Sequence, residues 1–203
     1  MPAAKSAVVS PALCSKCGAY LGPAGGDAAI SCRQCIDHHY DRAFAAGIYE
    51  QGLAVTIVRL KTDPHLFKRS KDLICSAYER TSLQNFDLII PVPLSRKRFH
   101  ERGSNQAEIL AAYLSKRSGI PLAKNALVRS THTAIHRAAM DKKAREMTVK
   151  NSFEIARVEG LVGAHLLLVD DVFTSGATVS ACSKLLKDNG ASRIDVLTLA
   201  RAV

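Results

Sequence analysis

The hydrophobic pattern of the chain is clearest between residues 166 and 186. Four consecutive apolar residues at positions 166–169 run into two adjacent carboxylates, Asp170 and Asp171, and a short polar loop follows. After the loop, apolar side chains recur at helical spacing at Val179, Cys182, Leu185 and Leu186. We therefore predict a buried strand, an acidic edge, a tight loop and the start of a helix. An unbroken apolar run of this kind is typical of a parallel strand covered on both faces.

The same order of elements occurs earlier in the chain. Residues 87–94 predict a strand that ends in prolines, and a helix begins near Asn105. The apolar face of this helix comprises Ala107, Leu110, Ala111 and Leu114. The remaining predicted elements are helices at 51–60 and 65–80 and strands at 152–155 and 194–200. Such alternation of strands and helices predicts an α/β fold with a parallel sheet flanked by helices.

The loop after the acidic pair has the composition of a phosphate site. Ligands of open α/β sheets bind at the carboxyl ends of the strands, and a helix N-terminus directs free N–H groups at an anion. The loop consists of Thr174, Ser175, Gly176, Ala177 and Thr178. Asp170 and Asp171 would repel the phosphate but could accept hydrogen bonds from hydroxyls beside it. A phosphate and vicinal hydroxyls together describe a ribose 5-phosphate. The alternative is an ordinary strand–turn–helix with a capping threonine and a solvated acidic pair.

Residues 169–178 resemble the phosphoribosyl-pyrophosphate (PRPP) signature of the type I phosphoribosyltransferases. The resemblance implies that Asp170 and Asp171 hold the ribose hydroxyls, that residues 174–178 bind the 5-phosphate, and that Mg²⁺ accompanies PRPP. It also implies a cationic pyrophosphate loop after the strand at 87–94. The basic residues of that loop are Arg96, Lys97 and Arg98, with Arg102 in a catalytic or loop-positioning role. Residues 129–150 would form a mobile hood over the site, with an exposed basic helix as the alternative.

The cysteines predict a metal site. Four of the six form two CxxC pairs: Cys14 with Cys17, and Cys32 with Cys35. The pairs supply four soft ligands for a tetrahedral structural zinc ion, and the turn-rich segment between them would take its folding energy from the metal. Disulfides or unligated thiols are the alternatives. His38 and His39 are predicted to be surface or linker residues, because four thiolates already complete the shell.

Further motifs make the chain similar to the ComF family of competence-associated proteins. That family joins an N-terminal four-cysteine zinc motif to a C-terminal phosphoribosyltransferase domain. Besides the cysteines and the PRPP loop, the matching motifs are Pro91–Leu94, Arg102–Gln106, Tyr49–Glu50 and Leu60–Lys61. The positions that depart from the family pattern are Ser104, His136, Thr148 and Ser175. They concern the acceptor side of the pocket rather than the fold.

The ComF resemblance covers nearly the whole chain and implies four segments. They are a flexible N-terminus (1–11), a zinc-ribbon-like motif (12–36), a connector (37–49) and a type I phosphoribosyltransferase-like domain (50–203).

The 203-residue chain is basic, with 28 Lys and Arg against 18 Asp and Glu and a net charge of +10. This excess predicts a polyanionic ligand or partner, either a polyphosphate or a nucleic acid. No signal peptide is visible, and no apolar run approaches the ~20 residues of a membrane helix. We therefore expect a cytoplasmic protein without membrane insertion.

Two functions of different classes follow. The first is an enzyme that binds PRPP or another phosphoribosyl ligand and transfers the phosphoribosyl group to a nitrogen acceptor. The second is a non-catalytic competence factor that assists uptake of single-stranded DNA beside a helicase, which the ComF resemblance implies. Aromatic residues make up only 5% of the chain and Trp is absent, which disfavours a stacking platform for bases. A purine-salvage enzyme is a weaker third reading, and a homodimer is a further possibility.

Overall fold

The computed structural model describes residues 11–23, 31–81, 85–129, 153–156 and 158–202. The predicted flexible N-terminus therefore lies almost entirely outside the described residues. The predicted hood does so too, apart from Arg129, as do the two departures from the family pattern at His136 and Thr148.

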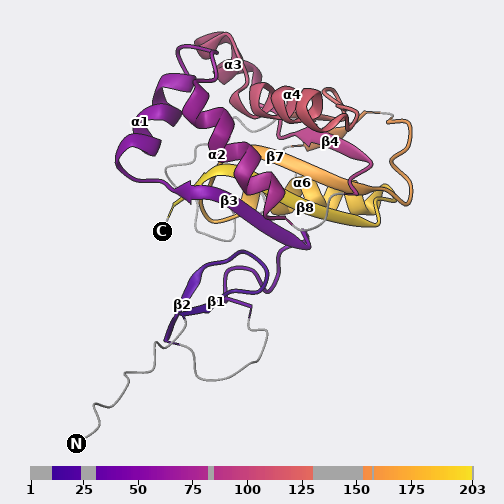
Figure 1. Ribbon diagram of the computed structural model, residues 1–203. Coiled ribbons are helices and arrows are strands. Elements are labelled where there is room, and N and C mark those ends of the chain that lie inside the picture. The colour runs from indigo at the N-terminus through magenta and orange to yellow at the C-terminus, as the bar shows by residue number, and fades with distance from the viewer. Residues whose placement is uncertain (1–10, 24–30, 82–84, 130–152, 157, 203) are drawn as a thin grey trace, which may run out of the picture.

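A four-stranded parallel sheet forms the centre of the molecule (Figure 1). Its strand order is β3 (Arg42–Ile48), β8 (Arg193–Arg201), β7 (His165–Phe173) and β4 (Leu88–Pro91). Strand β8 is buried over residues 194–200 and β7 over residues 166–169, and most of these side chains, on both faces, are apolar. Parallel strands of this composition require cover on each side of the sheet.

Helices supply that cover. One face carries α1 (Gln51–Leu60), α2 (Lys68–Glu79) and α4 (Gln106–Ser118), and the other carries α6 (Ala177–Asp188) (Figure 1). Alternate strand residues serve the two faces: Leu167 and Val169 pack with the first group of helices, while Leu166 and Leu168 pack with α6. None of the helices in the described part of the chain has the length and apolar character that a membrane crossing requires.

The predicted α/β class and its parallel sheet are confirmed, with some differences in the elements. The segment expected to be a connector contains β3, whose sequence is rich in alanine and has one β-branched residue, Ile48, at its end. The cationic loop is a short helix, α3 (Arg96–Arg102), because Ser95 caps it and Gly103 ends it with φ 71°. Strand β7 continues through the acidic pair to Phe173.

A second, two-stranded antiparallel sheet joins β5 (Leu127–Arg129) to β6 (Phe153–Ile155). The strand expected at 152–155 is therefore present, but it lies outside the main sheet. Strand β5 was not predicted from the sequence. Arg129 is the last residue of this strand.

The cysteine-containing segment forms a small module built on the hairpin of β1 (Pro11–Leu13) and β2 (Tyr20–Pro23). The module is not a detached appendage. Cys14, Cys17 and Cys35 belong to the same apolar cluster as Tyr40 and the α6 face of the sheet. The backbone N–H of Ala43, the second residue of β3, also donates to the carbonyl of Lys16 (2.7 Å). The module is thus packed onto the main core.

Candidate functional site

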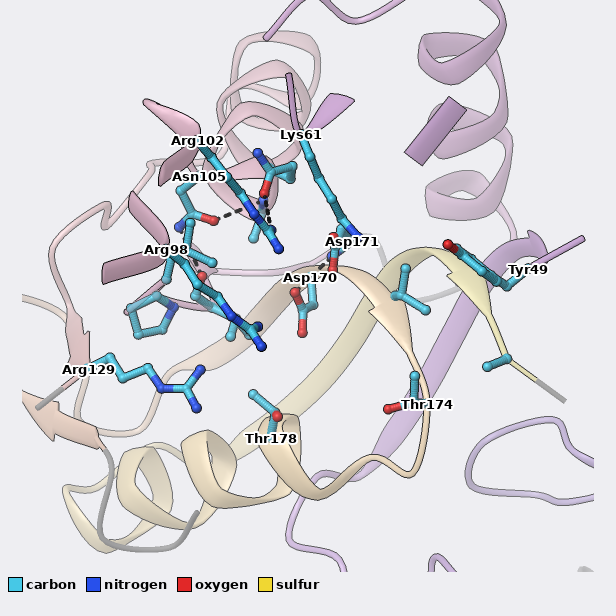
Figure 2. Close-up of a pocket in the computed structure, with 17 residues that line it drawn as sticks. Tyr49, Lys61, Arg98, Arg102, Asn105, Arg129, Asp170, Asp171, Thr174 and Thr178 are labelled. Atoms are coloured by element: carbon cyan, nitrogen blue, oxygen red, sulfur yellow. Dashed lines mark hydrogen bonds between the residues drawn. The ribbon is translucent and has the colours of Figure 1, made fainter. Parts of the chain in front are cut away.

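A cavity of about 410 Å³ opens at the carboxyl ends of β4 and β7 (Figure 2). Small-molecule sites occupy about 300–1,000 Å³, so the cavity suits a sugar phosphate. Its wall carries two carboxylates, four basic side chains and two threonines. These are Asp170, Asp171, Lys61, Arg98, Arg102, Arg129, Thr174 and Thr178. The position agrees with the general location of ligand sites in open α/β sheets.

The acidic pair is held by strand β7. Leu166 to Val169 are fully buried, so they fix the strand and leave the two carboxylates at the cavity wall. Burial and repulsion by Asp171 raise the pKa of Asp170 well above its usual value of 3.8. The Asp171 N–H donates to Oδ1 of Asp170 (2.8 Å), which opposes the shift, as does the charge of Arg129. The charged form of Asp170 is therefore disfavoured, and hydroxyl donors would stabilise it.

The loop between β7 and α6 offers backbone and hydroxyl donors. Gly176 is the N-cap of α6 with φ 78°, and as a glycine it has no side chain that could cap the helix. Thr174 and Thr178 line the cavity on either side of it. Ser175 is exposed outside the lining, and its Oγ accepts from the Ala177 N–H (3.4 Å). Helix α6 has 12 residues, so its dipole favours an anion at this end.

Basic side chains converge on the acidic pair from several elements (Figure 2). Arg98 and Arg102 come from one face of α3, because they are four residues apart, and Lys61 comes from the end of α1. Arg102 donates to Oε1 of the buried Gln106 (3.0 Å), which fixes its direction. Arg96 and Lys97 are exposed and are not among the residues that line the cavity.

The start of α4 contributes orientation rather than free donors. Asn105 caps the helix by accepting from the Ala107 N–H (3.2 Å), and its amide donates to the carbonyl of Val92 (3.0 Å). Gln106 donates to the carbonyl of Leu60 (3.3 Å), the residue before Lys61. The Arg102–Gln106 region is thereby tied to the end of α1, which keeps Lys61 and Arg102 on the same cavity.

Sequence reasoning missed some residues of this wall. Tyr49, Lys61 and Arg129 line the cavity but were not predicted as site residues. Their spacing along the chain gives no local signal, since β3, α1 and β5 reach the cavity only through tertiary packing. The family motif pairs Tyr49–Glu50 and Leu60–Lys61 were the sequence features that could have pointed to Tyr49 and Lys61.

The four clustered cysteines could hold a metal ion. Their Sγ atoms all lie within 4.8 Å of one another. A tetrahedral zinc ion with Zn–S bonds of about 2.3 Å separates its sulfurs by about 3.8 Å, and Cys17 and Cys32 have that Sγ separation of 3.8 Å. A disulfide would need about 2.05 Å. The four residues thus fit a closed structural zinc site.

Hydrogen bonds around the cluster favour thiolate ligands. The Cys32 N–H donates to Sγ of Cys14 (3.2 Å). Burial raises the pKa of the Cys14 thiol, but hydrogen bonds from the backbone of Cys32, Cys17 and Lys16 outweigh it and lower the pKa to about 6. Burial raises the pKa of Cys17 and Cys35, and a bound cation would oppose that effect.

Two curated relatives match nearly the full length of the chain. Competence protein F of Haemophilus influenzae is 33% identical over 208 residues, covering 94% of this chain and 90% of the relative. DNA utilization protein YhgH of Escherichia coli K12 is 29% identical over 204 residues, covering 94% and 85%. The chain therefore belongs to the competence protein F (ComF) family, as its motifs predicted.

Other comparisons add less. No family model matches the chain. Competence protein ComFC of Bacillus subtilis is 28% identical over 162 residues, covering 76% of this chain and 62% of the relative. Among solved structures, a purine phosphoribosyltransferase from Pyrococcus horikoshii aligns with a TM-score of 0.42 and 20% identity, covering 66% of this chain and 71% of that chain.

Proposed function

We propose that this protein binds PRPP or ribose 5-phosphate in the cavity at the end of β7 and transfers the phosphoribosyl group to a nitrogen acceptor. The observation that carries the proposal is the meeting of three kinds of group in one cavity. An acidic pair, two threonine hydroxyls that flank the start of α6, and four basic side chains line the same wall. A ribose 5-phosphate with a pyrophosphate leaving group requires this combination.

The roles follow from charge. The N–H groups at the start of α6, with Thr174 and Thr178, would bind the 5-phosphate. Asp170 and Asp171 would accept hydrogen bonds from the ribose hydroxyls, which relieves the unfavourable burial of Asp170. Ser175, Gly176 and Ala177 complete the phosphate loop in this proposal.

Basic residues would serve the leaving group. Arg98, Arg102 and Lys61 stabilise negative charge that develops on pyrophosphate. Arg96 and Lys97 would approach a bound pyrophosphate only if their part of α3 moved, so we assign them a lesser part. Mg²⁺ bound with PRPP would add charge neutralisation, and carboxylates are among the ligands it accepts.

The reaction is a substitution at C1 of the ribose. A nitrogen nucleophile forms a bond to C1 as the bond from C1 to the pyrophosphate oxygen breaks. Pyrophosphate leaves with the electron pair, and the nitrogen gives up its proton to the departing pyrophosphate or to water. Positive charge on the ribose in the transition state is favoured by the nearby carboxylates, and negative charge on the leaving group by the arginines.

Calorimetric titration with ribose 5-phosphate, and with PRPP plus Mg²⁺, tests the proposal. We expect binding by the wild-type protein and weaker binding by Asp171→Asn and Thr178→Val. The matched control is Thr56→Val, since Thr56 is a half-buried residue of α1 that does not line the cavity and whose hydroxyl donates to the Gly52 carbonyl (2.7 Å). Absence of heat and of thermal stabilisation at millimolar ligand would refute a phosphoribosyl site.

A second candidate function is the handling of single-stranded DNA. The names of the relatives, competence protein and DNA utilization protein, favour it. On the chain itself, α3 exposes Arg96 and Lys97 beside Phe99, whose side chain is 46% exposed. A DNA affinity that falls steeply with salt and is unaffected by saturating PRPP would favour this function, since each neutralised phosphate releases counterions.

A further inference from the structure

A chain of contacts links the four-cysteine cluster to the phosphate loop. The hydroxyl of Tyr40 lies 3.1 Å from Sγ of Cys35 and 2.9 Å from Nδ1 of His38. A metal-bound thiolate has no proton, so Tyr40 would donate to the sulfur and accept from the Nδ1–H of His38. Tyr40 is 1% exposed, so water does not compete for these bonds. The orientation of the His38 ring is therefore set from the cysteine cluster.

The same edge of that ring, Nδ1 with Cε1, also faces the phosphate loop. A methyl group placed on Gly176 would lie 2.9 Å from Cε1 of His38 and 3.1 Å from its Nδ1. It would also lie 2.8 Å from Cζ of Phe173. Two rings thus lie close to the backbone of Gly176, the N-cap from which α6 begins.

Phe173, the last residue before the loop, is braced by the same module. The Tyr40 ring meets the Phe173 ring edge-on, with centroids 5.9 Å apart. The guanidinium of Arg201 lies over the Phe173 ring, 5.0 Å from its centroid, and donates to the carbonyl of Cys17. Beyond the loop, the His39 N–H donates to Oγ of Ser180 in α6 (3.2 Å). Both flanks of residues 174–178 are therefore held by the cysteine-containing part of the chain.

We propose that His38 and Tyr40 are positioning residues that brace the phosphate loop against the four-cysteine cluster, so that metal binding and phosphate binding are thermodynamically coupled. The ligand half of this statement rests on the function proposed above, whereas the bracing of the loop does not. Coupling is reciprocal: if the metal raises affinity for ribose 5-phosphate by some factor, ribose 5-phosphate raises affinity for the metal by the same factor. His38 and Tyr40 thereby act without touching the ligand.

Amide hydrogen exchange in the zinc-loaded, ligand-free protein tests the bracing directly. We expect exchange within residues 174–180 to accelerate about 5- to 10-fold in His38→Ala and Tyr40→Phe, because each variant removes one contact of the series. The reporting amide is that of Ser180, whose N–H donates to the Gly176 carbonyl (2.9 Å). Exchange in α4, on the opposite face of the sheet, should stay unchanged. A merely structural role would accelerate both regions. His38→Asn should restore much of the protection, since an amide N–H can replace Nδ1–H.

Ribose 5-phosphate affinity and zinc content are measured on the same proteins. The matched control is Tyr20→Phe, which makes the same chemical change in the same module at a side chain that is 63% exposed. We expect Tyr40→Phe and His38→Ala to retain zinc and to bind ribose 5-phosphate about 5- to 10-fold more weakly, which corresponds to roughly one hydrogen bond. Tyr20→Phe should match the wild type in both measurements.

The outcomes separate the two proposals. If the wild type does not bind ribose 5-phosphate, the proposed function fails, while exchange in residues 174–180 still decides whether the loop is braced. If the wild type binds but both variants retain its exchange rates and affinity, the bracing is refuted and the proposed function stands. Loss of zinc from either variant with unchanged ribose 5-phosphate affinity would equally overturn the coupling.

Discussion

Replacement of Gly176 by alanine is the most direct perturbation of the phosphate loop. Gly176 has φ 78°, a left-handed conformation that costs an alanine about 1–2 kcal/mol. The new methyl group would also lie 2.8 Å from Cζ of Phe173 and 2.9 Å from Cε1 of His38. Real side chains do not tolerate such approaches, so one of the rings must move. Phe173 is 3% exposed and packs between Tyr40 and Arg201, so little room is available.

Gly119 supplies the matched control, which isolates the effect of the rings. It ends α4 with φ 79°, and a methyl group there would meet nothing within 4 Å. The backbone strain of Gly119→Ala and of Gly176→Ala is therefore nearly the same, as is the entropy that each substitution removes from the unfolded chain. Only the crowding differs, and overpacking costs about 1–3 kcal/mol.

Equilibrium urea unfolding of the zinc-loaded variants measures this difference. We expect the free energy of unfolding of Gly176→Ala to fall below that of Gly119→Ala by about 1–3 kcal/mol, the cost of overpacking. Adding His38→Ala to Gly176→Ala should recover part of the loss, because one of the two rings is then absent. Equal stability of the two single variants would show that the rings yield freely, and the argument that they shape the loop would be wrong.

Three further predictions concern the rest of the site. Arg98→Ala should weaken pyrophosphate binding, measured by calorimetry, by about 1.5–3 kcal/mol, the range for hydrogen bonds to charged groups, whereas Lys97→Ala should change it little, because only Arg98 lines the cavity. Asp170→Asn should stabilise the ligand-free protein at neutral pH. The pKa of Asp170 is raised above 3.8 in the folded state, so wild-type stability falls as pH rises from 3.8 to the folded-state pKa. The advantage of the variant in urea unfolding should therefore vanish at the acidic end of this pH interval. Cys14→Ser should lower zinc content, by elemental analysis, from about one per chain, while circular dichroism of the parallel sheet persists.

The local part of the site could be predicted because its signals are contiguous. Strand β7, the phosphate loop and α6 follow one another within residues 165–188, and their patterning is strong enough to reveal each. Strand β3 could not be predicted, because its alanine-rich sequence resembles a linker and its pairing partner β8 is about 150 residues away in the chain. Such long-range pairing overrides local preference.

The interpretation of His38 as a surface or linker residue overlooked its packing. Nothing in the spacing of two adjacent histidines after a cysteine pair indicates that one ring will rest on Gly176. The contact arises because the module folds onto the α6 face of the sheet, and Tyr40 fills the space between. The role of Lys61 escaped prediction in the same way, since the end of α1 reaches the cavity through tertiary contacts, among them the hydrogen bond between Gln106 and Leu60.

The distribution of charge on α3 bears on both candidate functions. Arg98 and Arg102 lie on the helix face that lines the cavity, whereas Arg96 and Lys97 are exposed elsewhere on the same helix. A compact pyrophosphate can reach only the first pair, but an extended polyanion can contact the second pair along the surface. The basic side chains of α3 therefore do not form one continuous patch. The two proposed functions would therefore use different side chains of α3, and a ligand in the cavity would not have to displace a nucleic acid from the surface.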